Sequence, residues 1–173
     1  MKVNNRGGKA WIFGDDVDTD VLAPGLYMKG SLEELASHCL EVIDPDFASN
    51  VAPGDVIVAG KNFGVGSSRE QAAEALKYLG VSTLLARSFA GIFFRNALNF
   101  GMIALTSAEI DRIRPGDRIV VDAAAGRVHN LTQNETYVCN ILPQPLLAMV
   151  HDGGLVPHLK KKLAHSVVKS IKQ

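Results

Sequence analysis

Short apolar runs alternate with amphipathic segments through the first two-thirds of the chain. Runs rich in aliphatic and β-branched residues predict strands at residues 10–13, 56–59, 81–88 and 102–105. The turn sequence APGD precedes the second run and Gly60 follows it, which limits that strand to the residues VIVA. Strands that alternate with helical segments in this way are typical of α/β domains.

The segments between these runs carry apolar residues at helical spacing. They predict helices at residues 31–40, 67–80 and 89–101, and a short helix at residues 107–113. Ser31, with Glu34 three residues later, has the pattern of a capping box and marks the start of the first helix. Gly80 and Gly101 are natural ends for the second and third helices.

The pattern changes after the turn RPGD. Residues 118–131 and 135–141 predict a β-meander, and the segment from Pro143 onward predicts one or two closing helices with Lys160, Lys161 and Lys162 on a solvated face. A chain of 173 residues is too short for two domains of ordinary size. We therefore expect one domain over residues 1–173, with a core at about 10–140 and a helical segment at about 143–173.

Composition excludes several classes of protein. Hydrophobic residues make up 47% of the chain and charged residues 21%, with 18 basic and 18 acidic side chains, so neither disorder nor binding to a nucleic acid is indicated. No apolar run is long enough for a membrane span, and the first residues lack the apolar stretch of a signal peptide. We therefore expect a cytoplasmic protein that binds no membrane.

The sequence FGVGSSREQAAE, residues 63–74, places hydroxyls and a guanidinium at the expected start of a helix. The unpaired N–H groups and the positive end of a helix attract anions. A P-loop would need a lysine where Ser67 follows Gly66, and a dinucleotide-binding loop would need a third glycine where Arg69 follows the pair Gly64 and Gly66. Both nucleotide patterns are therefore incomplete.

Two interpretations of the adjacent serines remain open. As helix caps, Ser67 with Glu70, or Ser68 with Gln71, would form a capping box. As a binding group, the two hydroxyls and Arg69 would hold an anion such as a carboxylate.

A second motif, GDDVDTDVLAP, places Asp16, Asp18 and Asp20 at alternate positions directly after the first strand. A calcium loop would need glycine at Val21 and glutamate at Tyr27, so calcium binding is not indicated. Solvated aspartates, or aspartates that form Asx-turns, are the simpler interpretation of this motif by itself.

Together, GDDVDTDVLAP, DPDFA and the stretch from VAPGDVIVAG to FFRNALNFG resemble the small subunits of 3-isopropylmalate dehydratase, in the aconitase superfamily. The similarity covers about residues 10–140 in order. It implies a swivelling β/β/α three-layer domain with a mixed sheet and C-terminal helices, which closes over a large subunit that carries a 4Fe-4S cluster. No cofactor is expected on this chain itself, because its two cysteines, Cys39 and Cys139, are too few and too far apart in the sequence for a cluster.

The resemblance also implies the roles of individual residues. Ser67 matches the catalytic base, Ser68 and Arg69 match the groups that bind a substrate carboxylate, and Asp20 matches an active-site aspartate. These roles are physically reasonable, because a helix N-terminus and a guanidinium lower the cost of a serine alkoxide. Arginine also fits a carboxylate better than lysine does.

The expected reaction is the isomerisation of 2-isopropylmalate to 3-isopropylmalate by dehydration and rehydration, in leucine biosynthesis. In the family, the loop PGLYMKGS reads the substrate's distinguishing group, so Met28 suits an isopropyl group and Lys29, unless it faces solvent, suits an extra carboxylate. The alternatives are therefore a homoaconitase or a methylmalate- or dimethylmalate-type dehydratase. An alternative of another class is a non-catalytic module that binds an anion or a nucleotide.

Overall fold

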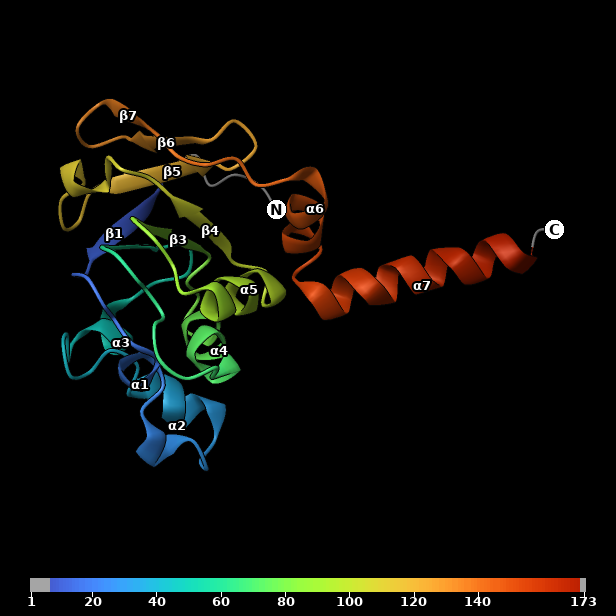
Figure 1. The fold of residues 1–173 in the computed structure, drawn as a ribbon, viewed down its shortest axis with the longest axis horizontal. Helices are drawn as coiled ribbons and strands as arrows, with labels where there is room; N and C mark the ends of the chain where they lie inside the picture. Colours follow the sequence, from blue (N-terminus) through green and yellow to red (C-terminus); the bar gives the residue numbers. More distant parts are fainter. Residues whose placement is uncertain (1–6, 172–173) are drawn as a thin grey trace.

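The computed structural model describes residues 7–171, with side chains described up to residue 164. The first six residues, on which the absence of a signal-peptide pattern partly depended, lie outside this range. A seven-stranded mixed sheet forms the centre of the fold, with the strand order β4-β3-β2-β1-β5-β6-β7 (Figure 1). The strands are β1 (Gly8–Ile12), β2 (Val56–Ala59), β3 (Thr83–Ala86), β4 (Ile103–Thr106), β5 (Arg118–Asp122), β6 (Arg127–Asn130) and β7 (Glu135–Val138).

The helices lie between and after these strands. They are α1 (Thr19–Leu22), α2 (Leu32–Ser37), α3 (Phe47–Asn50), α4 (Glu70–Tyr78), α5 (Gly91–Asn99), α6 (Gln144–His151) and α7 (Leu155–Ile171), with 3-10 turns η1 (Gly25–Tyr27) and η2 (Ile110–Arg112). Strands β1 to β4 are parallel, whereas β5 pairs antiparallel with β1 and continues into the predicted meander.

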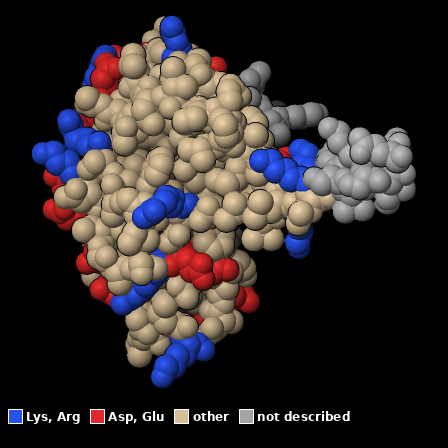
Figure 2. Space-filling view, turned by 45° about the vertical axis from the view of Figure 1, so that its right-hand side comes forward, with Lys and Arg blue, Asp and Glu red and all other residues tan. Residues whose placement is uncertain are grey.

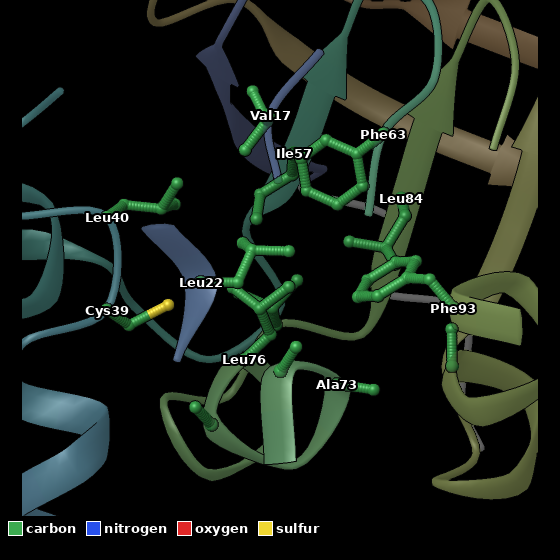
Figure 3. Packing of buried hydrophobic residues seen from close by; sticks show 14 of the residues in the cluster. Val17, Leu22, Cys39, Leu40, Ile57, Phe63, Ala73, Leu76, Leu84 and Phe93 are labelled. Atoms are coloured by element: carbon green, nitrogen blue, oxygen red, sulfur yellow. The ribbon is translucent and has the colours of Figure 1, made fainter. Parts of the chain in front are cut away.

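The parallel strands have two buried faces. Every residue of β2 and β3 is buried, as expected for parallel strands that are covered on both sides. On one face, Ile57 packs with Leu22, Leu76 and Phe93 from α1, α4 and α5 (Figure 3). On the other face, apolar residues of β2 and β3 pack with those of the meander and α6. These layers confirm the β/β/α arrangement that the resemblance implied.

One predicted helix start is wrong. The helix expected from residue 67 begins at Glu70, Arg69 occupies the N-cap position in an extended conformation, and no side chain caps this end. The N–H of Arg69 donates to the carbonyl of Ser67 at 2.8 Å, and this turn leaves both serines outside the helix. Ser67 and Ser68 are therefore not helix caps.

Other local predictions differ in outcome. Ser31 does cap α2, because its hydroxyl accepts the N–H of Glu34 at 3.1 Å. Gly80 follows the end of α4 with a φ of +89°, a conformation that glycine adopts without the strain that a side chain causes. The short helix expected at residues 107–113 is only the 3-10 turn η2.

The two closing helices expected after Pro143 are present. Helix α6 packs beside α5, and α7 extends away from the rest of the molecule (Figure 1). Lys160, Lys161 and Lys162 are exposed, as predicted. Among residues 7–171, no helix combines the length and the apolar character needed to cross a bilayer.

Candidate active site

The two sequence motifs lie on neighbouring loops. They follow β1 and β2, which are adjacent parallel strands, so both loops emerge from the carboxyl edge of the sheet, where ligands bind in open α/β folds. Backbone hydrogen bonds join the loops: the N–H of Gly64 donates to the carbonyl of Val17, and that of Thr19 donates to Val65, each at 2.8 Å. The pairing of the strands thus continues into the motifs and fixes their relative position.

The two glycines of the second loop are required by the backbone. Gly64 and Gly66 have φ values of +77° and +110°. A Cβ at Gly64 would lie 2.1 Å from the ring of Phe93, and one at Gly66 would lie 2.9 Å from the hydroxyl of Thr19. These glycines let the loop pack against α5 and α1, and this holds the serines that follow them in place.

The first two aspartates of the D-x-D-T-D loop have structural roles. Asp16 accepts a hydrogen bond from the side-chain amide of Asn62 at 2.8 Å, and Asp18 caps α1 by accepting the N–H of Val21 at 2.8 Å. Within residues 7–171, no group of three or more histidine, cysteine, aspartate and glutamate side chains is placed to hold a metal ion. For Asp18, the simpler interpretation as a local backbone acceptor is correct.

Asp20 instead reaches the second loop and forms an ion pair with Nη1 of Arg69. The same nitrogen donates to the carbonyl of Ala23 at 3.1 Å. Nε and Nη2 of Arg69 donate no hydrogen bond within the described range, and the side chain is 25% exposed. One edge of the guanidinium is therefore fixed, and the Nε and Nη2 edge is left for a bidentate partner such as a carboxylate.

Both serines are exposed beside this guanidinium. The hydroxyl of Ser67 lies 3.3 Å from that of Thr19, a residue that is only 1% exposed. This distance is longer than that of a typical O–H···O hydrogen bond, but a weak hydrogen bond is still possible at this separation. Ser68 makes no hydrogen bond to the part of the chain that the structure describes. Together with the uncapped N-terminus of α4, the serines form a surface of hydrogen-bond donors suited to an anion.

The expected specificity residues lie on the loop around η1. The ring of Tyr27 stacks on that of His38 with centroids 3.6 Å apart, and Met28 is half-buried against the core. Lys29 is exposed and has no hydrogen bond or ion pair with residues 7–171. Among the described residues, neither Met28 nor Lys29 forms a hydrogen bond or ion pair with the serines or Arg69, so their role in specificity stays a prediction.

Sequence reasoning assigned no role to Thr19, Ala23 or His38. The only sequence signal for Thr19 is its position between two aspartates. Its contact with Ser67 joins residues 48 positions apart, and no local pattern predicts such a contact. The carbonyl of Ala23 carries no side-chain signal at all. The stacking of His38 on Tyr27 depends on how α2 packs beside η1, which the sequence pattern does not specify.

The candidate site is open to solvent. Ser67, Ser68, Arg69 and Asp20 line neither of two cavities within the described residues, whose volumes are about 430 and 660 Å³. The smaller cavity lies at the opposite, amino-terminal edge of the parallel strands, beside α6. A reaction that requires a site closed to water would therefore need a second surface over these residues.

Comparison with known proteins agrees with this geometry. The aconitase C-terminal domain family matches residues 24–110. The 3-isopropylmalate dehydratase small subunit of Wolinella succinogenes is 46% identical over 167 residues, covering 96% of this chain and 100% of that relative. The methanogen homoaconitase small subunit of Methanothermobacter thermautotrophicus is 47% identical over 158 residues, covering 90% and 91%. The crystal structure of 3-isopropylmalate dehydratase from Methanocaldococcus jannaschii has a TM-score of 0.87 at 43% identity, covering 97% and 99%.

The fold and the two paired loops define a swivel domain of the aconitase type. The chain belongs to the family of 3-isopropylmalate dehydratase small subunits, and it is thus a subunit of a hydro-lyase. The family resemblance drawn from the D-T-D and S-S-R-E motifs is confirmed.

Proposed function

We propose that this chain supplies the proton-transfer and carboxylate-binding groups of a dehydratase that interconverts 2-isopropylmalate and 3-isopropylmalate in leucine biosynthesis. The observation that carries the proposal is the group of Ser67, Ser68 and Arg69, in which neither serine caps the helix and one edge of Arg69 has no partner among the residues whose side chains are described. A large subunit covers this group and closes the site. We expect the assembled enzyme to act in the cytoplasm.

In this proposal, the Nε and Nη2 edge of Arg69 and the hydroxyl of Ser68 bind one carboxylate of the substrate. The hydroxyl of Ser67, as its alkoxide, removes the proton from carbon during dehydration and returns one during rehydration. The neighbouring guanidinium and the N-terminus of α4 favour that negative charge. Asp20 acts by holding Arg69 in position, and Thr19 acts by orienting the hydroxyl of Ser67.

The residues of this chain do not fit a metal cluster. Cys39 and Cys139 are buried in cores on opposite faces of the sheet. Burial raises the pKa of the Cys39 thiol far above its usual range, and burial with the nearby Asp122 raises the pKa of Cys139 to about 11. We therefore assign the 4Fe-4S cluster to the large subunit, where it would supply Lewis-acid chemistry toward the departing hydroxyl.

A second candidate substrate is a homoaconitate-type tricarboxylate. The observation in its favour is Lys29, an exposed cation on the η1 loop with no partner among residues 7–171. The methanogen homoaconitase small subunit is similar to this chain to the same degree as several dehydratase subunits. Similarity alone does not rank the two substrates, and the half-buried, apolar Met28 supports the isopropyl group.

Anaerobic reconstitution with the large subunit tests the proposal. The mixture should isomerise 2-isopropylmalate with a higher kcat/KM than homoaconitate, methylmalate or dimethylmalate, and the single chain should have no activity. A preference for homoaconitate would replace the substrate. Tight binding of ATP by the isolated chain, without activity in any mixture, would support the nucleotide-binding alternative and contradict the enzyme assignment.

A further inference from the structure

Helix α7 has an apolar surface that the described structure leaves largely exposed. Leu155, Val156, Leu159 and Leu163 are 36, 59, 47 and 66% exposed. At about 100° per residue these positions fall on one side of the helix, within an arc of about 100°. In proteins, most of the stability of a helix comes from tertiary packing of its apolar side rather than from the helix propensity of its residues. An exposed apolar side of this length therefore indicates a binding surface.

The base of α7 is fixed in its direction. Asp152, in the turn between α6 and α7, accepts a hydrogen bond from Nδ1 of His158 at 2.6 Å and forms an ion pair with Lys161. Hydrogen bonds from Lys161 and His158 hold the pKa of Asp152 below its usual range. Gly154 lies so close to α5 that a Cβ there would be 2.1 Å from the carbonyl of Asn99. The helix thus leaves the molecule in a defined direction with its apolar side presented to solvent (Figure 1).

The charges around the apolar side determine which partner fits. Lys160 and Lys162 are exposed and flank it on its two sides, and the helix sequence contains no acidic residue. Basic side chains gather where this segment leaves the body (Figure 2). If two copies packed through this side, these lysines would face each other, which costs free energy. An apolar groove with an acidic rim is the complementary surface.

We propose that α7 docks into such a groove on the large subunit and anchors the small subunit at a position separate from the catalytic loops. The inference rests on the proposed function for the existence of that partner. Small-subunit relatives match nearly the full length of this chain, so the similarity extends into α7. Assembly with a large subunit is the context that these relatives share by name. The commonest alternatives, a second copy and an anionic membrane, are outcomes of the test.

The test measures binding of the full-length chain to the purified large subunit, together with turnover. Leu159→Gln with Leu163→Gln removes the apolar side but keeps good helix formers. Lys160→Glu with Lys162→Glu reverses the sign of the charges on both sides of the apolar surface. The control is Ala164→Gln, which is exposed and lies about 140° around the helix from Leu159.

Both double variants should weaken the Kd by about tenfold or more, and the control should not change it. Turnover at saturating large subunit should stay at the wild-type value, because the catalytic loops are untouched. Wild-type Kd in both double variants overturns the inference and leaves the proposed function intact. No binding or activity by the wild-type pair overturns the proposed function itself.

Two further measurements assign the alternative occupants. Sedimentation of the isolated wild-type chain as a dimer, with the leucine variant as a monomer, would identify a second copy as the occupant and overturn the proposal. Binding of the wild type to phosphatidylglycerol vesicles that the leucine variant loses would identify a membrane surface and overturn it as well. A wild-type monomer that ignores vesicles is the expected result.

Discussion

At the scale of single residues, replacing Ser67 distinguishes a catalytic role of this serine from a structural one. Ser67→Ala should lower kcat of the reconstituted enzyme by about 10²- to 10⁴-fold, the usual effect of losing a general base. Because Ser67 does not cap α4, its removal should not cost the ~1 kcal/mol typical of a lost cap. Turnover and urea unfolding measure the two effects, with the exposed Ser37→Ala as the control. A wild-type kcat in Ser67→Ala would end the catalytic assignment.

Lys29 decides between the two substrates. If its ammonium binds the extra carboxylate of a tricarboxylate, Lys29→Met removes a charge-assisted hydrogen bond of about 1.5 to 3 kcal/mol, and kcat/KM for homoaconitate should fall about 10- to 150-fold. The isopropyl substrate should lose nothing, because an apolar side chain suits its hydrocarbon group. Both substrates are measured with both proteins. A wild-type preference for homoaconitate that disappears in Lys29→Met would overturn isopropylmalate as the substrate.

At the scale of elements, α1 connects the two loops through Thr19. This residue is buried, its N–H pairs with Val65, and its hydroxyl is the contact of Ser67. Thr19→Val keeps the shape and removes the hydroxyl, so kcat should fall about 3- to 10-fold, as expected for one neutral hydrogen bond. Thr19→Ser should restore most of the activity.

The control for the Thr19→Val variant is its stability compared with that of the wild type. Denaturant midpoints of Thr19→Val and the wild type should agree closely, because the hydroxyl of Thr19 has no partner in the described structure other than Ser67. Equal loss of activity in Thr19→Ser and Thr19→Val would show that packing of α1, and not the hydroxyl, is responsible.

At the scale of the whole molecule, Asp117 connects the two halves of the sheet. Its carbonyl accepts the N–H of Ala10 in β1 at 2.8 Å, and its carboxylate accepts the N–H of Arg114 and the side-chain amides of Asn130 and Gln133. Burial raises the pKa of this carboxyl, but the three hydrogen bonds together outweigh burial and lower it below its usual value. A lowered folded-state pKa stabilises the fold above the ordinary pKa of aspartate and loses this contribution as the pH falls through the folded value.

Asp117→Asn should therefore reduce the free energy of unfolding by about 1 to 2 kcal/mol at pH 7, where charge-assisted bonds are lost. The difference from the wild type should shrink as the pH falls below about 4, the ordinary pKa of aspartate. Urea unfolding at pH 7, 5, 4 and 3 measures this. Asp46→Asn is the control, because Asp46 is exposed and its carboxylate accepts no hydrogen bond from the described part of the chain. A difference that stays constant with pH would contradict the linkage.

The sequence by itself determined the strands, the longer helices, the meander and the residues of the two motifs, whereas the short helices α1 and α3 were not predicted. The predicted features depend on the local periodicity of apolar residues and on glycine, which can adopt backbone conformations that other residues rarely adopt. The match of D-T-D and S-S-R-E to one family needed no coordinates either. Ser31 as a cap and Gly80 as a helix end were predictable because their partners lie within a few residues.

Only the tertiary structure decided what the motif side chains do. Ser67 and Ser68 have the pattern of caps, but a loop pinned to Val17 and Thr19 keeps them outside α4. The anchoring of Arg69 by Asp20 and Ala23 joins residues more than 40 positions apart, and such contacts depend on the order of the strands rather than on local pattern. The exposed side of α7 was equally undecided, because its apolar residues would look the same in a core helix. Only the exposure of Leu155, Val156, Leu159 and Leu163 in the described structure makes them a surface.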